Sequence, residues 1–356
     1  MHIFFDARWT RFDVHDGISR YSASLLGALA KLHPVTMIIC DERQLNLLPK
    51  GVPYVMLNNP LSVQEFRLPQ QLNQLGADVV FSPMQIMGSW GRHYKLIFTL
   101  HDVIYYQFRT PPTSLKPPAR IAWRLFHAAK WPQRWQLNQA DHIATVSQTS
   151  KRLIQSMHLT DRPISVVYNA PSLRPSKPTA AFKKELVYTG SFMRYKNVEL
   201  LVAAMELLPE YKLHLVSKIT PTRQRELLRL AKNPEQIVCW NGASDEQYKA
   251  LLKTATALVS ASLAEGFGLP LLEAMSAGTP VIATNMPIFH EVCGQASTYF
   301  DPHSTESFAH AVHTLENPMH HKTMSVKGTK QAANFTWQQS AAGLLVIMEQ
   351  LGSQTH

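Results

Sequence analysis

The chain has 356 residues, of which 45% are hydrophobic and 17% charged, which excludes a disordered chain and leaves enough apolar residues for two α/β domains. The 35 Lys and Arg against 25 Asp and Glu give a formal net charge of +10, which favours an anionic partner: a nucleotide, a nucleic acid or a membrane surface. No run of eighteen apolar residues occurs, so the sequence predicts no membrane-spanning helix.

The cysteines and the N-terminal residues indicate the compartment. Cys40, Cys239 and Cys293 lie far apart in the sequence and form no C-x2-C pair, which indicates neither a disulfide framework nor a zinc site. Asp6 and Arg8 follow a short apolar stretch that is typical of a first strand and not of a signal peptide. We therefore predict a cytoplasmic protein, whose membrane contact would be peripheral and on the inner face of the cytoplasmic membrane.

The first half of the chain alternates strand and helix patterns, which predicts a parallel sheet with helices on both faces. Strands are predicted at residues 2–5, 35–40, 53–57, 78–81, 95–100, 142–146 and 164–167. Helices are predicted at residues 19–30, 63–75, 118–138 and 148–157. Residues 169–178 contain three prolines and little that could pack in a core, so we predict an interdomain linker there.

The second half repeats this alternation and predicts a second α/β domain. Its predicted strands are residues 185–189, 212–216, 236–240, 257–260 and 280–284. Its predicted helices are residues 198–207, 221–231, 245–252, 270–278, 304–316, 318–334 and 336–351.

One stretch of the second half, residues 256–284, predicts a phosphate site. Pro270 suits the first turn of a helix, where its missing N–H has no partner, and Gly278 can end that helix in the left-handed conformation. The loop before the helix lies beyond the carboxyl end of a strand, where ligands bind in open α/β sheets, and reads Glu265-Gly266-Phe267-Gly268. Its glycines permit close approach of the backbone to a ligand, and the N–H groups of the helix start point at an anion.

Two glutamates of this stretch are eight residues apart. On a continuous helix, eight steps of about 100° would place Glu265 and Glu273 roughly 80° apart, so they do not share one helical face. We interpret them as two groups that reach different parts of one ligand. The alternative is that Glu273, in the first helical turn, only complements the helix dipole and that Glu265 is a solvated loop charge.

Residues 265–283, EGFGLPLLEAMSAGTPVIA, resemble without a gap the E-x7-E signature of retaining nucleotide-sugar glycosyltransferases with the GT-B fold. The resemblance implies two Rossmann-like, doubly wound domains that face a cleft. Residues 1–170 would form the acceptor-side domain and residues 178–335 the nucleotide-sugar domain, with the helix of residues 336–351 packed back on the first.

The same resemblance assigns roles to this stretch. Glu265 would contact the hydroxyls of the transferred sugar, and Glu273 would contact the ribose of the donor. The donor would also contact the loop that contains Gly266, Phe267, Gly268 and Leu269.

Two motifs in the first half resemble loops of this family. Residues 13–21 resemble a glycine-rich loop near the diphosphate or acceptor, but Asp16 and Ser19 replace glycines, which leaves Gly17 as the candidate for close approach. The pair His101 and Asp102 resembles the family's His-Asp pair beside the transferred sugar, in which a neutral imidazole accepts a hydrogen bond from a sugar hydroxyl and a carboxylate fixes its tautomer. The alternatives are an ordinary turn at residue 17 and a packing role for the histidine.

Residues 188–197 resemble the loop whose lysine binds the leaving diphosphate, and Lys196 takes that place. Many family members carry an arginine directly after the loop glycine, where this chain has Ser191, so Arg194 is the candidate for the second cation. A charge-assisted bond to phosphate contributes about 1.5 to 3 kcal/mol. The alternative is that both side chains are exposed loop cations.

Residues 116–135 interleave cations with aromatic residues. On a helix Arg120, Arg124 and His127 share one side, which suits an anionic membrane surface with tryptophans at its boundary. The same interleaving could bind nucleic acid, which we regard as the weaker interpretation. The third alternative is a helix whose aromatic residues pack on the sheet and whose cations are solvated.

Taken with the resemblance, these motifs predict a retaining hexosyltransferase. It would transfer a hexose, with mannose from GDP-mannose favoured over glucose from UDP-glucose, to a hydroxyl of a glycan or lipid-linked acceptor in cell-surface polysaccharide assembly. Lys196 and the helix start near Gly268 would stabilise the leaving diphosphate, and no D-x-D pair is present to bind a metal, so we predict neither a metal nor a cofactor. Two alternatives stay open: a GT-B sugar-nucleotide epimerase, and a non-catalytic module that binds membrane or nucleic acid.

Overall fold

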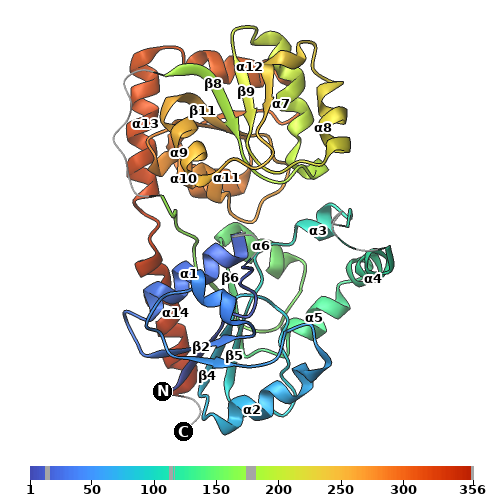
Figure 1. Cartoon of the computed structure of the whole chain (residues 1–356), viewed down its shortest axis with the longest axis vertical. Coiled ribbons are helices and arrows are strands. Elements are labelled where there is room, and N and C mark those ends of the chain that lie inside the picture. Colours follow the sequence, from blue (N-terminus) through green and yellow to red (C-terminus); the bar gives the residue numbers. More distant parts are fainter. Residues whose placement is uncertain (13–16, 112–114, 116, 174–181, 354–356) are drawn as a thin grey trace. The chain divides into compact units, whose positions relative to one another are not determined.

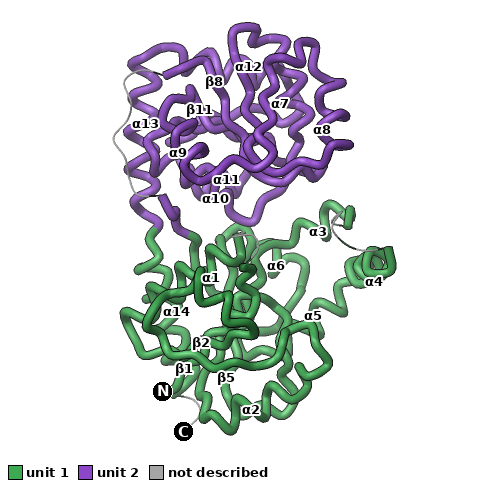
Figure 2. The backbone as a smooth tube through the Cα atoms, in the orientation of Figure 1, with its two compact units in different colours: residues 1–169, 336–356 green, residues 170–335 purple. Residues whose placement is uncertain are grey.

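A computed structural model describes residues 1–12, 17–111, 115, 117–173 and 182–353 of the chain. The chain divides into two compact units, unit 1 with residues 1–169 and 336–356 and unit 2 with residues 170–335 (Figure 2). The chain therefore passes between the units twice, and unit 1 contains both chain ends. The predicted linker of residues 169–178 falls at the first passage, and its residues 174–178 lie outside the described residues.

Within the described residues, the sheet of unit 1 has seven parallel strands in the order β3-β2-β1-β4-β5-β6-β7 (Figure 1). Strand β1 lies between β2 and β4, so that Ile3 is opposite both Val35 and Val79. The strands are β1 Ile3–Asp6, β2 Val35–Ile39, β3 Tyr54–Met56, β4 Val79–Ser82, β5 Lys95–Thr99, β6 His142–Thr145 and β7 Ile164–Val166.

Helices cover both faces of this sheet. Phe4, Val80 and Phe98 belong to a core that includes apolar residues of α2, α5 and α6, whereas α14 packs against α1 and β4. The helices of unit 1 are α1 Gly17–Leu29, α2 Leu68–Gln74, α3 Ile104–Gln107, α4 Pro117–Ala128, α5 Trp131–Leu137, α6 Gln148–Ser156 and α14 Trp337–Gly352, with short 3-10 helices η1 Glu42–Asn46 and η2 Val63–Arg67.

The described sheet of unit 2 has six parallel strands in the order β10-β9-β8-β11-β12-β13. The strand order reverses between β8 and β11, and such a reversal is the place where open α/β sheets bind ligands. The strands are β8 Lys183–Tyr188, β9 Lys212–Leu215, β10 Ile237–Cys239, β11 Ala255–Ser260, β12 Val281–Thr284 and β13 Ser297–Phe300.

The core of unit 2 is built from the sheet and its helices. Leu186, Leu213 and Val259 of the sheet pack with Leu201 of α7 and Phe308 of α12. The helices are α7 Val198–Ala204, α8 Pro221–Leu228, α9 Asp245–Thr254, α10 Leu269–Ser276, α11 Pro287–Cys293, α12 Thr305–Thr314 and α13 Pro318–Ala332, with 3-10 helices η3 Arg194–Lys196, η4 Met205–Leu207, η5 Pro234–Gln236 and η6 Gly294–Ala296. Two parallel sheets flanked by helices confirm the predicted α/β fold.

Two predicted helices differ from the structure, and three short elements were missed. The helix predicted at residues 63–75 begins as the 3-10 helix η2 and becomes α-helical only from Leu68. The helix predicted at residues 118–138 is two helices, because Pro132 lies in the first turn of α5 and cannot continue α4. The short elements α3, α11 and β13 were not predicted at all.

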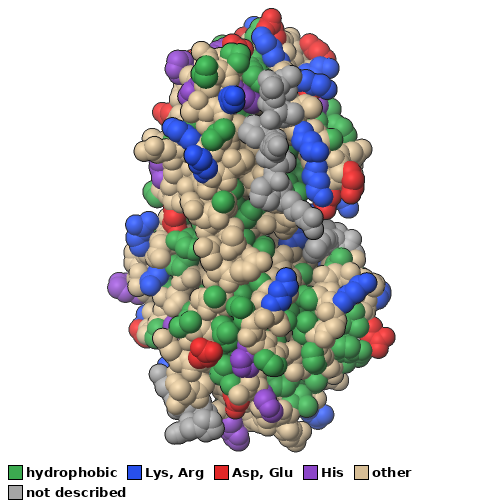
Figure 3. All heavy atoms as spheres, turned by 90° about the vertical axis from the view of Figure 1, so that its left-hand side faces the viewer, with side chains coloured by type: hydrophobic (Ala, Val, Ile, Leu, Met, Phe, Trp, Pro, Cys, Tyr) green, Lys and Arg blue, Asp and Glu red, His purple; other side chains and the backbone are tan. Residues whose placement is uncertain are grey.

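The described helices include none that is both long enough and apolar enough to cross a membrane. Lys and Arg side chains occur on both units in the face shown in Figure 3.

Candidate active site

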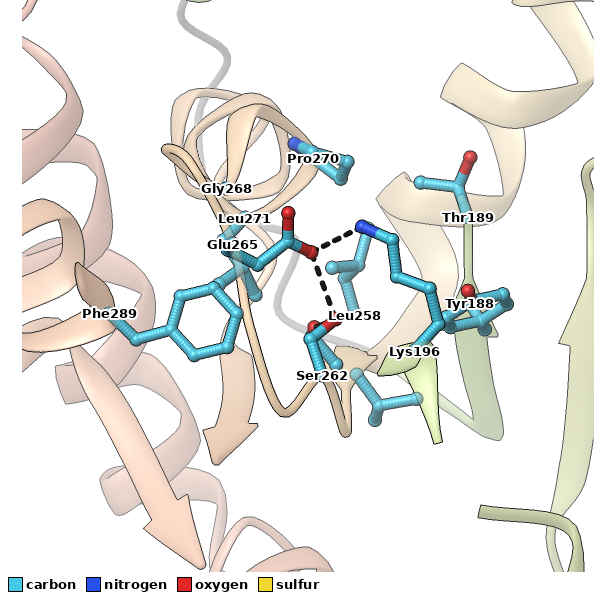
Figure 4. Close-up of a pocket in the computed structure, with 12 residues that line it drawn as sticks. Tyr188, Thr189, Lys196, Leu258, Ser262, Glu265, Gly268, Pro270, Leu271 and Phe289 are labelled. Carbon is cyan, nitrogen blue, oxygen red and sulfur yellow. Dashed lines mark hydrogen bonds and ion pairs between the residues drawn. The ribbon is translucent and has the colours of Figure 1, made fainter. Parts of the chain in front are cut away.

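A pocket lies at the carboxyl ends of β8 and β11 in unit 2, where the strand order reverses (Figure 4). Its cavity volume is about 10 Å³. Its polar lining comes from the end of β8, the loop before α7 and the loop after β11, and includes Thr189, Lys196, Ser260, Ser262 and Glu265. Three of the predicted site residues, Lys196, Glu265 and Gly268, therefore meet in one place.

The start of α10 forms one wall of this pocket. Gly268 is the N-cap residue with φ +97°, and a Cβ there would lie 3.0 Å from the Phe289 ring, so both the backbone conformation and the packing favour glycine. Pro270 lies in the first turn, and Gly278 follows the helix with φ +81°, as the sequence predicted. The N-terminal end of an eight-residue helix, with its partial positive charge, therefore borders the pocket.

Lys196 and Glu265 form an ion pair inside the pocket. The Nζ atom of Lys196 donates to Oε1 of Glu265 at 2.5 Å, and both side chains are only about 15% exposed. The same carboxylate oxygen accepts a hydrogen bond of 2.9 Å from Ser262 Oγ (Figure 4). A largely buried carboxylate that accepts two donors is held in one orientation.

Hydrogen bonds to backbone carbonyls fix the two loops that carry Lys196 and Glu265. The Leu263 amide donates to the Tyr195 carbonyl at 2.7 Å, which ties the loop after β11 to the loop that carries the lysine. The Thr284 hydroxyl donates to the Ser262 carbonyl at 2.7 Å, and the Arg223 guanidinium donates to the Phe192 carbonyl at 3.2 Å. Neither loop depends on the ion pair alone for its position.

Two site residues that sequence reasoning did not identify are Ser262 and Tyr188. Ser262 is 1% exposed and stands three residues before Glu265, a spacing that could have suggested a contact across the loop. The Tyr188 hydroxyl donates to the Ser191 carbonyl at 2.5 Å, and burial, together with the nearby charge of Glu265, raises the pKa of this phenol well above its usual value. Tyr188 therefore stays protonated and acts as a donor that shapes the loop.

The other predicted residues of unit 2 lie around the pocket but do not line it. Arg194 is exposed, and its side chain has no hydrogen bond or ion pair with the described residues. Gly266 and Phe267 are buried in the loop, and Leu269 is partly buried at the helix start. The exposed guanidinium of Arg194 could therefore move toward a ligand.

The position of Glu273 corrects the sequence analysis. Glu273 is the fifth residue of α10 and lies in its second turn, not in the first turn, where no acidic residue occurs. Only 5% of Glu273 is exposed. A buried carboxylate in the second turn is poorly placed to complement the helix dipole, so that alternative loses its structural basis.

His101 lies in unit 1, after the carboxyl end of β5. Its Nε2 atom lies 2.8 Å from the Pro83 carbonyl, which can only accept, so Nε2 carries the proton and Nδ1 is the acceptor. The sequence analysis expected a carboxylate to fix the tautomer, but Asp102 accepts from the Ile104 amide at the start of α3. Burial lowers the pKa of His101, which keeps the imidazole neutral near pH 7.

The glycine-rich loop of unit 1 is described only in part. Gly17 is the first residue of α1, and a Cβ at that position would meet no atom within 4 Å. Asp16, which the sequence analysis weighed against a phosphate contact, lies outside the described residues. Gly17 therefore leaves open space at the start of α1.

Two family models match the chain, one over most of the first half and one over most of the second half. Residues 15–173 match the glycosyltransferase family 4 family, and residues 170–331 match the family of glycosyl transferases group 1. The chain is 30% identical over 275 residues to the O-antigen chain mannosyltransferase B of Escherichia coli, which covers 68% of this chain and 67% of that protein. The chain belongs to the group 1 glycosyltransferases. It is also 25% identical over 312 residues to the O-antigen chain mannosyltransferase RfbU of Salmonella typhimurium, which covers 84% of this chain and 87% of that protein.

Solved structures agree on the fold of this glycosyltransferase. The sucrose-phosphate synthase of Thermosynechococcus elongatus superposes with a TM-score of 0.75 at 20% identity, over 99% of this chain and all of that chain. The glycosyltransferase WaaG, involved in lipopolysaccharide biosynthesis, superposes with a TM-score of 0.69 at 16% identity, over 97% of this chain and 99% of that chain. The glycosyltransferase therefore has the GT-B fold that the sequence predicted.

Proposed function

We propose that this glycosyltransferase transfers a hexose, with retention of configuration, from a nucleoside diphosphate sugar to a hydroxyl of a glycan or lipid-linked acceptor in cell-surface polysaccharide assembly. The observation that carries the proposal is the pocket of unit 2, in which Lys196, Glu265 and the N-terminal end of α10 meet. A cation and a helix start suit a diphosphate, and a carboxylate beside them suits sugar hydroxyls.

The proposed mechanism uses fixed charges. Lys196 and the start of α10 stabilise the negative charge that develops on the leaving diphosphate as the sugar becomes oxocarbenium-like. Binding of the donor replaces the ion pair of Lys196 and Glu265 with contacts to phosphate and to sugar hydroxyls. His101, neutral and with Nδ1 as its acceptor, accepts a hydrogen bond from a hydroxyl of the transferred sugar.

GDP-mannose is the proposed donor. The two relatives described above are both named as mannosyltransferases of the O-antigen chain, which supports mannose and a polysaccharide acceptor. UDP-glucose is the second choice of donor.

Thermal-shift screening tests the proposal directly. The Tm of the protein is compared with GDP-mannose, UDP-glucose, UDP-GlcNAc, GDP and UDP, and we expect the guanosine compounds to raise it most. In a separate activity assay, we expect transfer of the sugar to require an acceptor. Analysis of the product anomer tests retention. Turnover of the sugar nucleotide without any acceptor would favour an epimerase, and no stabilisation by any nucleotide would contradict the proposal.

Transfer is expected to be independent of divalent metal. The sequence has no D-x-D pair, and Lys196 lines the pocket, where its charge would neutralise the diphosphate in place of a metal. We expect kcat to be unchanged, within about twofold, after treatment with a chelator. Loss of activity that manganese restores would contradict this expectation.

Helices α4 and α5 form the proposed membrane surface. No residue of α4 is buried, and large apolar side chains are exposed along both helices: Ile121, Leu125, Trp131 and Trp135. Residues 117–137 contain four cations and no acidic residue. Of these cations Arg134 is paired with Asp161, which leaves Arg120, Arg124 and Lys130 for lipid. Exposed apolar groups among such cations suit an anionic lipid surface better than solvent.

One predicted cation of this surface is corrected by the structure. His127 is not a solvated charge beside Arg120 and Arg124, because its ring stacks on Trp123 at 4.1 Å and contacts Tyr105 of α3. Burial lowers the pKa of His127, so the ring stays neutral. His127 attaches α4 to α3 and contributes no charge to the surface.

Neutralising Arg120, Arg124 and Lys130 together to glutamine is expected to weaken binding to vesicles that contain an anionic phospholipid. Each cation at such a surface contributes about 1 kcal/mol, so the loss is roughly a hundredfold at low salt, with unchanged donor affinity. The matched control replaces the exposed Lys322, Lys327 and Lys330 of α13 in the same way. Equal losses in both variants would show that net charge, and not this surface, binds lipid.

A further inference from the structure

The second passage of the chain between the units places two aromatic residues, Phe335 and Trp337, on either side of the unit boundary. Phe335 is the last residue of unit 2, and Thr336 caps α14 of unit 1. Within unit 2, the Phe335 ring contacts the predicted site residue Phe267. Within unit 1, the Trp337 ring contacts Tyr21, which in turn contacts the predicted site residue His101.

In unit 2, Phe335 contacts the donor loop. Its ring meets the Phe267 ring edge-on, with centroids 5.7 Å apart. Phe267 is 4% exposed and lies between Gly266 and Gly268, in the loop that begins at Glu265. A movement of this loop therefore acts on the Phe335 ring.

In unit 1, Trp337 reaches His101 through one residue. Its ring meets the Tyr21 ring edge-on at 5.8 Å, and Tyr21 in turn meets the His101 ring edge-on at 5.0 Å. Tyr21 is 3% exposed, so it has no room to move independently of its neighbours. The imidazole is thus fixed by the Pro83 carbonyl on one side and by this aromatic stack on another.

The first passage of the chain is anchored in a similar way. The Ser340 hydroxyl of α14 donates to the Tyr168 carbonyl at 2.6 Å in unit 1. The Ser276 hydroxyl, at the end of α10, donates to the Leu173 carbonyl at 2.9 Å in unit 2. The first passage is therefore attached to α10 and to α14, and the second passage contacts the loop before α10 and continues into α14.

We propose that Trp337 is a positioning residue for His101, and that residues 335–337 couple the donor loop to this histidine. The inference rests on the proposed function for the role of His101 in transfer. The contact of Phe335 lies within unit 2 and the contact of Trp337 within unit 1, and the backbone of residues 335–337 connects the two.

The first experiment is a double-mutant cycle in the full chain. Trp337→Leu should lower the kcat of transfer by about two- to tenfold, the effect of one edge-to-face aromatic pair, with the affinity for the nucleoside diphosphate unchanged. Trp337→Phe should restore most of the rate, and Trp90→Leu, at a residue that is 85% exposed, should have no effect. In the His101→Ala background Trp337→Leu should cause no further loss, and an equal loss in both backgrounds would overturn the proposal.

The second experiment needs no turnover. In NMR spectra, the ring-proton signals of His101 should shift in Trp337→Leu and stay in place in Trp90→Leu. Unmoved signals in both variants would overturn the proposal on their own, whereas absence of transfer by the unmodified protein would count against the proposed function and not against this one.

The third experiment tests the donor-loop side. Added GDP or UDP, whichever stabilises the protein more, should shift the indole N–H signal of Trp337. Phe335→Leu should abolish that response while it leaves nucleotide affinity within about twofold. A response that persists in Phe335→Leu would overturn the coupling.

Discussion

Glu265→Gln is expected to lower kcat by roughly a hundredfold while the affinity for free nucleoside diphosphate stays within about twofold of the unmodified value. The substitution keeps the size of the side chain and removes the charge that faces Lys196 and Ser262. If this carboxylate contacts the reacting sugar, the loss appears in the transition state and not in binding of the nucleotide. Isothermal titration and single-turnover kinetics separate the two quantities.

Glu273→Gln is the matched comparison, because it makes the same chemical change eight residues along the same segment. We expect it to weaken donor and free nucleoside diphosphate alike, since the ribose is common to both. A small loss of stability without any binding effect would show that Glu273 has only a structural role in α10. Equal losses of nucleotide affinity in both variants would show that this division of roles is wrong.

Lys196→Met is expected to lower kcat/KM by about 10- to 100-fold and to weaken nucleoside diphosphate binding by a similar factor. A charge-assisted bond to phosphate contributes about 1.5 to 3 kcal/mol, and each 1.4 kcal/mol is a factor of ten. The variant also leaves the half-buried Glu265 carboxylate without its cation, so Tm should fall, and the double variant with Glu265→Gln should recover part of that fall.

Arg194→Met is the control for this prediction. Arg194 belongs to the same 3-10 helix as Lys196 and carries the same charge, but its side chain is exposed and does not line the pocket. A small effect on nucleotide affinity would assign the diphosphate to Lys196 alone. An effect as large as that of Lys196→Met would make Arg194 the second cation, and unchanged affinity in both variants would remove this loop from the donor site.

The sequence predicted those features whose cause is local. Pro270 and Gly278 mark the ends of α10 because one lacks an N–H and the other adopts a positive φ, and neither effect depends on the rest of the fold. Spacing likewise predicted the alternation of strands and helices. The family resemblance, confirmed by the comparisons, came from one uninterrupted segment.

The features that the sequence did not predict depend on contacts between distant residues. Lys196 and Glu265 are 69 residues apart and meet because β8 and β11 are neighbours in the sheet, an order that periodicity does not contain. The tautomer of His101 is set by Pro83, which follows the adjacent strand β4. Helix α3 and strand β13 have four residues each, too few for a period of 3.6 or 2 to be recognised.

The discontinuity of unit 1 has a consequence for synthesis on the ribosome. Helix α14 buries Leu344, Ile347 and Met348 and packs against α1, yet it is translated only after all of unit 2. At about 5 to 20 residues per second, the surface of α1 waits roughly 15 to 65 s for its partner, during which unit 2 can already fold. Premature termination before Thr336 would leave unit 2 whole and the apolar surface of α1 without the helix that covers it.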